Sequence, residues 1–129
     1  MLSPLFHNDA SSASVYFPAR VYMVESDSVI LDDANIVVDL DVSGAIVYME
    51  LFNPPHLPDY YPLPFIYDAR HDTYDMFFLP NAPRAYAVRS TDHDDIDLIY
   101  DTIDAVIGMR VCNASVRLPN CVKRTDSYV

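Results

Sequence analysis

The chain has little glycine and little positive charge. Of its 129 residues, 2 are glycines and 8 are lysines or arginines, against 19 aspartates and glutamates. The formal net charge of −11 repels nucleic-acid phosphates and anionic lipid headgroups, so we expect neither a nucleic acid nor a membrane as partner. Opposite charges attract and steer association, so the composition favours a basic protein partner.

Sequence motifs of common enzyme classes are also missing. The chain holds no Gly-x-Ser-x-Gly nucleophile elbow, no glycine-rich phosphate loop and no His-Glu-x-x-His helix. Its four histidines are scattered, and their spacing pairs none of them with a nucleophile or an orienting carboxylate. We therefore name no catalytic residue and no cofactor, and the sequence favours a non-catalytic protein.

Long apolar runs are absent as well. No stretch approaches the roughly 18 apolar residues of a membrane-spanning helix, and the N-terminus lacks the basic and apolar regions of a secretory signal. We therefore expect a cytoplasmic protein. Its two cysteines, Cys112 and Cys121, are expected to be free thiols, because disulfides persist mainly in oxidising compartments.

The chain does contain a repeated segment. Residues 32–53 align without a gap on residues 92–113, an offset of 60. We interpret this as an internal duplication within a single domain spanning 1–129. The expected parts are repeat one at about 14–53, a proline-rich connector at 53–66, repeat two at about 67–113 and a C-terminal tail at 114–129. The identical pairs are Asp32/Asp92, Ile36/Ile96, Asp41/Asp101, Ala45/Ala105, Met49/Met109 and Asn53/Asn113.

Each repeat alternates apolar and mixed residues, which is typical of strands with one buried face. The short polar links at 41–44 and 101–104 predict hairpin turns, with a left-handed residue at Gly44 and at Asp104. The fold is therefore expected to be mainly β: two repeated antiparallel meanders of about four strands each, packed with pseudo-two-fold symmetry as a sandwich or barrel-like core. The expected inward rows are Ala45, Val47, Met49 and Leu51, and Ala105, Ile107, Met109 and Val111.

Two groups of residues are candidate binding residues. Arg20 with Tyr22 and Arg84 with Tyr86 recur two apart, and such residues share one face of a strand. Each pair could anchor an anionic or carboxylate group, or the arginine could simply stack on its tyrosine or meet a surface aspartate.

The connector supplies the second group. Residues 53–65 contain five prolines, so this segment cannot form the interior of a sheet. Tyr60 and Tyr61 within it could dock into an aromatic groove of a partner. The alternative, which the sequence favours, is a stiff connector whose aromatic rings pack back onto the domain.

The acidic segment 91–97 contains candidate metal ligands. Asp92, Asp94 and Asp97 offer carboxylate oxygens within a short span. A calcium loop also needs a glycine turn and a distal glutamate, and both are missing here. The sequence therefore favours an acidic loop that runs into a strand over a metal site.

A set of tyrosine, acidic and glycine residues is spread over both repeats: Asp39, Asp41, Gly44 and Glu50 in repeat one, and Tyr67, Asp68, Asp72, Asp101 and Gly108 in repeat two. With these residues, parts of both repeats resemble the short bacterial family catalogued as domain of unknown function 2283. Its pattern opens with Tyr-Asp and an Asp four residues on, and closes with Asp-x-Asp-x-x-Gly before Val-x-Gly-x-Glu-x. Tyr48, Asp104 and Arg110 depart from it. The resemblance implies a small β-rich fold and carries no established activity; some such domains look like antitoxin-type partners of small toxins.

These observations favour a non-catalytic protein-interaction module with an acidic surface. One alternative is a small-molecule-binding protein or enzyme that uses a groove between the repeats. Another is a structural protein that self-assembles into a homo-oligomer through exposed strand edges.

Overall fold

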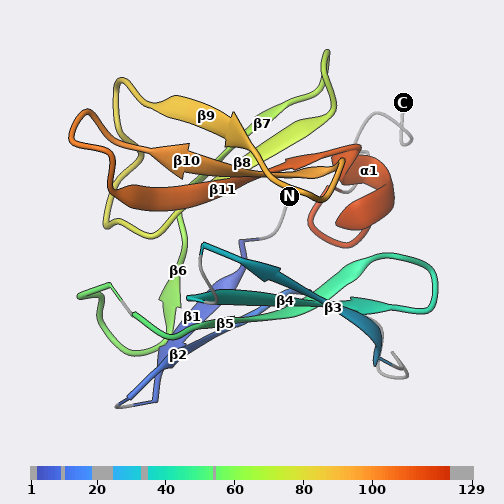
Figure 1. Cartoon of the computed structure of the whole chain (residues 1–129), viewed down its shortest axis with the longest axis horizontal. Coiled ribbons are helices and arrows are strands. Elements are labelled where there is room, and N and C mark those ends of the chain that lie inside the picture. Colours follow the sequence, from blue (N-terminus) through green and yellow to red (C-terminus); the bar gives the residue numbers. More distant parts are fainter. Residues whose placement is uncertain (1–2, 10, 19–24, 33–34, 54, 123–129) are drawn as a thin grey trace, which may run out of the picture.

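Alternating β-branched and aromatic residues form two antiparallel sheets that pack face to face (Figure 1). The computed structural model describes residues 3–9, 11–18, 25–32, 35–53 and 55–122. The elements are β1 (Leu5–Asn8), β2 (Ala13–Tyr16), β3 (Glu25–Leu31), β4 (Ile36–Asp41), β5 (Ile46–Leu51), β6 (Tyr61–Pro62), β7 (Phe65–Asp68), β8 (Thr73–Phe77), β9 (Ala87–Ser90), β10 (Ile96–Tyr100), β11 (Val106–Cys112) and α1 (Ala114–Arg117). This confirms the mainly-β, two-sheet prediction.

The two sheets have the same strand order. The first runs β3-β4-β5-β2-β1-β6 and the second, read from its other edge, runs β9-β10-β11-β8-β7. Five strands thus correspond one to one, where about four were predicted. In each sheet a hairpin (β1–β2 or β7–β8) adds to the far side of a three-strand meander. The matched order supports the duplication, which stays a prediction, and β1 and β7 begin ahead of its expected boundaries.

A β-bulge at the same place in both sheets corrects the predicted inward rows. The register shifts between Asp39 and Leu40 and again between Ile99 and Tyr100, so Val47 and Ile107 each stand opposite no single partner. Past the bulge, the side chains that would have faced the core face outward, and those that would have faced outward face the core. Ile46, predicted to face outward, is therefore in the core, whereas Ile107 packs on the outer face of the second sheet with Phe77 and Ile99.

One hydrophobic core is shared by both sheets. Met49 and Leu51 lie in the same buried cluster as Met109 and Val111, as predicted. Ala105, predicted to face inward, is exposed at the turn. The short segment that follows β11 adds Leu118, Cys121 and Val122 to the buried residues.

Both hairpin turns have the backbone conformation expected from the sequence. Gly44 has φ +85° and Asp104 has φ +64°, which confirms the left-handed residues. In each turn an aspartate Oδ1, from Asp41 or Asp101, accepts the backbone N–H two and four residues on. Burial acts to raise the pKa of Asp41, but hydrogen bonds from the side chain of Ser43 and from the turn amides outweigh burial and lower it.

Gly44→Val is expected to lower the free energy of unfolding by about 1 kcal/mol or more, because valine is strained at positive φ. A Cβ at this position would also lie 2.7 Å from Nη1 of Arg117. Urea unfolding measures the loss. Asp104→Gly, at the other left-handed position, serves as the control and should change stability by no more than about 0.5 kcal/mol, because glycine relieves strain there. Equal stability of Gly44→Val and the parent chain would contradict the prediction.

The proline-rich connector contributes one short strand, β6, to the first sheet. Among the described strands, β6 pairs with β1 alone and so lies at the edge of the first sheet, where proline is tolerated. Cys112 and Cys121 are both free, and burial raises the pKa of Cys121 to about 12. Within the described ranges, no helix has the length and apolar character needed to cross a membrane.

Candidate functional site

A groove of about 550 Å³ opens between the two sheets. Its floor is apolar and buried, formed by Ile36 and Leu51 of the first sheet and by Phe78, which follows β8 of the second. Tyr100, which is half-buried, forms part of its wall. Its rim is polar and carries Asp32, Asn35, Asn53, His56 and Asp104.

The rim residues come from loops that the two sheets hold in place. Asp32 and Asn35 lie between β3 and β4, and the Asn35 N–H donates to the Asp32 carbonyl at 2.9 Å. The Asn35 carbonyl accepts the N–H of Phe52, just past β5, at 2.8 Å. Asp104 lies in the β10–β11 turn of the other sheet. The groove is therefore a junction of two loops whose backbones are fixed independently.

The rim carries charge of both signs. Arg89 on β9 forms an ion pair with Asp104, and its guanidinium lies 4.2 Å above the Tyr100 ring centroid. Among the described residues, the Asp32 side chain has neither a hydrogen-bond nor an ion-pair partner. Asp32 is thus the uncompensated carboxylate of the groove, since Asp104 is already paired.

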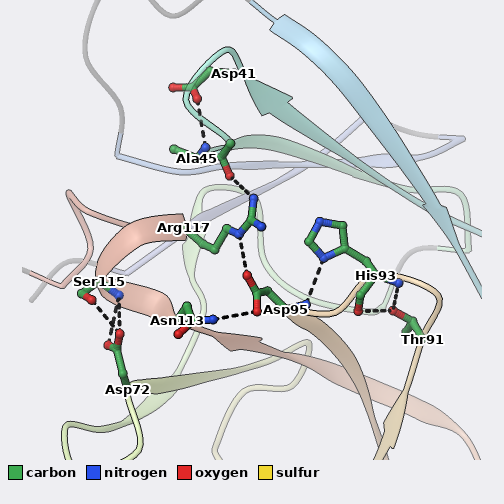
Figure 2. A network of polar contacts seen from close by, with 10 residues as sticks. Asp41, Ala45, Asp72, Thr91, His93, Asp95, Asn113, Ser115 and Arg117 are labelled. Carbon is green, nitrogen blue, oxygen red and sulfur yellow. Dashed lines mark hydrogen bonds and ion pairs between the residues drawn. The ribbon is translucent and has the colours of Figure 1, made fainter.

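The opposite end of the sandwich is filled by Arg117 (Figure 2). Its Nε donates to Oδ2 of Asp95 at 2.9 Å, and its Nη1 donates to the Gly44 carbonyl at 2.8 Å. Asn113 donates to the other oxygen of Asp95 at 2.8 Å. One guanidinium therefore bridges the β9–β10 loop of one sheet and the β4–β5 turn of the other.

The helix α1 carries Arg117 into this place. Its N-terminal turn is held by Asp72, which accepts hydrogen bonds from the backbone and the hydroxyl of Ser115. Leu118 is buried one residue beyond the helix. In Figure 1, α1 lies at one end of the sandwich, beside the β4–β5 turn.

The open groove and the Arg117 site are equivalent positions of the two repeats. Asn35 corresponds to Asp95 and Asp104 to Gly44, each at the offset of 60 that relates β4 to β10 and β5 to β11. Asn35 and the 41–45 turn lie at opposite ends of β4, so the two sites lie at opposite ends of the sandwich. One end is closed by the chain's own arginine, and the other is open.

The predicted arginine–tyrosine pairs are not confirmed as paired anchors. Arg20 and Tyr22 lie outside the described residues. β9 begins at Ala87, so Arg84 and Tyr86 precede the strand on which their shared face depended. Arg84 is exposed, whereas the Tyr86 hydroxyl donates to the buried carboxylate of Asp75 at 2.8 Å.

Asp75 explains why Tyr86 turns toward the sheet. Arg110 on β11 binds both oxygens of Asp75, at 2.7 and 2.9 Å, and this bond raises the pKa of Arg110. Burial, followed by the hydrogen bond to Asp75, raises the pKa of Tyr86. Tyr86 thus belongs to a structural network on the outer face of the second sheet.

Of the two connector tyrosines, one packs back onto the domain and the other is exposed. The Tyr61 hydroxyl donates to the Pro80 carbonyl at 2.7 Å, so this ring packs back onto the domain. Tyr60 is 67% exposed and has φ +56°. Its ring centroid lies 4.5 Å from that of His7. Tyr60 therefore remains accessible to a partner.

The acidic segment 91–97 is organised by hydrogen bonds within the chain. The Thr91 hydroxyl donates to the Ile96 carbonyl, and the Asp95 N–H donates to Nδ1 of His93 at 3.1 Å. Asp92 and Asp94 are exposed, while Asp97 lies on β10 near the Cys112 thiol. Across the described ranges, no group of three or more histidine, cysteine, aspartate or glutamate side chains could hold a metal ion.

Reasoning from the sequence did not identify the residues of the open groove or the role of Arg117. The groove between the repeats was expected only as a general alternative. One signal was available in the alignment: at the offset of 60, Asn35 stands where the other repeat has Asp95. That difference marks a loop whose counterpart binds a cation. At the same offset, Leu57 of the connector stands where the tail has Arg117, so the connector supplies no matching cation.

Comparison of the chain with protein-family models, with curated proteins and with solved structures gave no match in any of the three.

Proposed function

We propose that the protein is a non-catalytic interaction module that binds a basic segment of a partner protein in the open groove. The observation that carries this proposal is the difference between the two ends of the sandwich. At one end the junction of the sheets holds a guanidinium, and at the equivalent end the junction is an open groove with an unpaired carboxylate, Asp32.

Electrostatics support a basic partner. The chain carries a net charge of −11, so it attracts a positively charged segment of a partner before the two molecules are in contact. At the rim, Asp32 offers a carboxylate, and Asn35 and Asn53 offer amide oxygens that accept hydrogen bonds. The buried floor provides apolar surface for the aliphatic part of a long side chain.

The side chains of the groove favour binding over catalysis. Among the described residues that line it, none is a serine, threonine, cysteine or lysine. Covalent catalysis by those nucleophiles is therefore not available there. His56 and the aspartates could exchange protons, but His56 is exposed, so a desolvated acid–base site is not formed.

A small-molecule ligand is the second candidate. The groove volume of about 550 Å³ falls within the roughly 300–1,000 Å³ range of small-molecule sites, and its floor is apolar. A small cationic ligand would use the same Asp32 carboxylate as a partner segment. The size of the bound species therefore separates the two candidates.

Asp32→Asn is expected to reduce capture of the partner at least about fivefold, because it removes the unpaired carboxylate and keeps a residue that tolerates positive φ. The full chain is immobilised, incubated with lysate of its native source at about 0.05 and 0.3 M salt, and the bound proteins are quantified by mass spectrometry. Capture should fall with salt.

Asp94→Asn is the matched control, since it removes the same charge from an exposed position in the acidic segment 91–97. It should leave capture within about twofold of the parent chain. A partner retained equally by both variants would place the interaction away from the groove and contradict the proposal. Light scattering on the same samples tests self-assembly through the edge strands β3 and β9.

A further inference from the structure

We infer that the group seated in the open groove is an arginine side chain of the partner, held as Arg117 is held at the opposite end. This inference rests on the proposed function and names the chemistry that the groove recognises. Its basis is that the chain already contains one filled copy of the site, so the geometry of the ligand can be read from Arg117.

The filled site defines what an arginine needs. The side chain of Arg117 is 23% exposed and its guanidinium meets a carboxylate of one sheet and a carbonyl of the other. Gly44 lets the guanidinium approach the turn, because a Cβ there would stand 2.7 Å from Nη1. Two acceptors in different directions suit the planar fork of arginine better than the single ammonium of lysine.

The open groove repeats the backbone frame of that site. The Phe52 N–H donates to the Asn35 carbonyl as the Cys112 N–H donates to the Asp95 carbonyl, both at 2.8 Å. The Asp104 N–H donates to the Asp101 carbonyl at 3.3 Å, and the equivalent bond of Gly44 to Asp41 is 3.0 Å. By this correspondence, the Asn35 side chain and the Asp104 carbonyl are the counterparts of the two acceptors that bind Arg117.

The two sites differ in two respects. Asp104 stands where the filled site has Gly44, so an entering guanidinium must lie farther from this turn than Arg117 lies from Gly44. The second difference sets the charge. Asn35 replaces the carboxylate of Asp95 with a neutral amide, so the negative charge must come from elsewhere on the rim. Asp32 supplies it, because it belongs to the same loop and its backbone carbonyl is bonded to Asn35. Its counterpart Asp92 is exposed and takes no part in binding Arg117.

Another part of the rim, formed by Tyr100 and Asp104, already binds a guanidinium. Tyr100 and Asp104 together bind the side chain of Arg89, which is 52% exposed. An entering arginine competes with Arg89 for Asp104 and meets its positive charge. Removing that charge should tighten the binding of a cation, whereas it would weaken the binding of a carboxylate ligand.

The test titrates the ¹⁵N-labelled full chain with a capped peptide, Gly-Ser-Arg-Ser-Gly, and follows backbone amide shifts at about 0.05 M salt. The expected result is saturable shifts at Asn35, Asn53 and Asp104, with at least about fivefold weaker binding of the peptide that has lysine in place of arginine. Asp32→Asn should weaken the arginine peptide about fivefold or more, and Arg89→Gln should tighten it. Asp94→Asn should leave it unchanged.

Equal binding of the arginine and lysine peptides, or weaker binding by Arg89→Gln, would overturn the inference. If Asp32→Asn loses the captured partner while both peptides bind alike, the proposed function stands and the arginine assignment fails. If neither partner capture nor peptide binding depends on Asp32, both fail. Free arginine bound as tightly as the peptide would assign the groove to a small molecule and also overturn the inference.

Discussion

Replacing Met109 by aspartate is expected to unfold both sheets in a single transition. Met109 is fully buried and pairs with Met76 on β8. It belongs to the same core cluster as Met49 and Val38 of the other sheet. An unpaired carboxylate in that core costs several kcal/mol, in addition to the lost packing of methionine. Such a loss approaches the 5–15 kcal/mol by which domains are typically stable.

Thermal and urea unfolding followed by far-ultraviolet circular dichroism and by tyrosine fluorescence measures this effect. The two signals should change together, because the core is common to both sheets. Met109→Leu is the control and should cost less than about 1.5 kcal/mol, since volume and polarity are nearly kept. If the first sheet stays folded in Met109→Asp, with its amide resonances in place, the shared-core interpretation is wrong.

Gly108→Ala is expected to cost about 3 kcal/mol or more, although it adds a single methyl group. The new Cβ would lie 2.3 Å from the carbonyl oxygen of Met76 and 3.3 Å from Cα of Phe77. Both neighbours are backbone atoms of the paired strand β8, which cannot move aside without breaking the ladder to β11. The loss is therefore at or above the upper end of typical overpacking costs of roughly 1–3 kcal/mol.

The equivalent position of the first sheet provides the comparison. Tyr48 occupies it, is half-buried, and forms a 2.6 Å hydrogen bond with Ser14. Tyr48→Ala should cost about 1–2 kcal/mol, the usual range for losing part of a half-buried contact. Chemical denaturation of the two variants side by side gives the difference. A cost below about 1 kcal/mol for Gly108→Ala would show that β8 and β11 can separate locally.

Local patterns in the sequence determined much of the fold. The alternation of apolar residues predicted the strands around Met49 and Met109, because side chains in a strand change face at every residue. The polar links predicted left-handed residues at Gly44 and Asp104, because a tight hairpin needs positive φ there. The repeat at an offset of 60 predicted two similar sheets. Each of these follows from interactions between neighbours along the chain.

The tertiary structure alone decided which faces, strand pairs and ends carry the candidate site. The bulge at Val47 reverses the alternation, and it depends on the register with β4 rather than on local sequence. Arg84 and Tyr86 were judged to share a strand that begins only at Ala87, so their spacing was misleading. The β1–β2 hairpin joins β5 across a long connection, which a simple meander does not anticipate.

The candidate site shows most clearly what local sequence patterns could not predict. Arg117 reaches the carbonyl of Gly44 across 73 residues of sequence, so its role exists only once the two sheets have packed. The same packing leaves the equivalent end open, with Asp32 unpaired beside Asn35. The sequence therefore determined two segments of matching pattern and a net charge of −11. Which half binds an arginine of its own, and which half leaves a groove open, depends on how the segment after each repeat packs. The C-terminal segment places Arg117 between the sheets, whereas the connector has the buried Leu57 at the equivalent position.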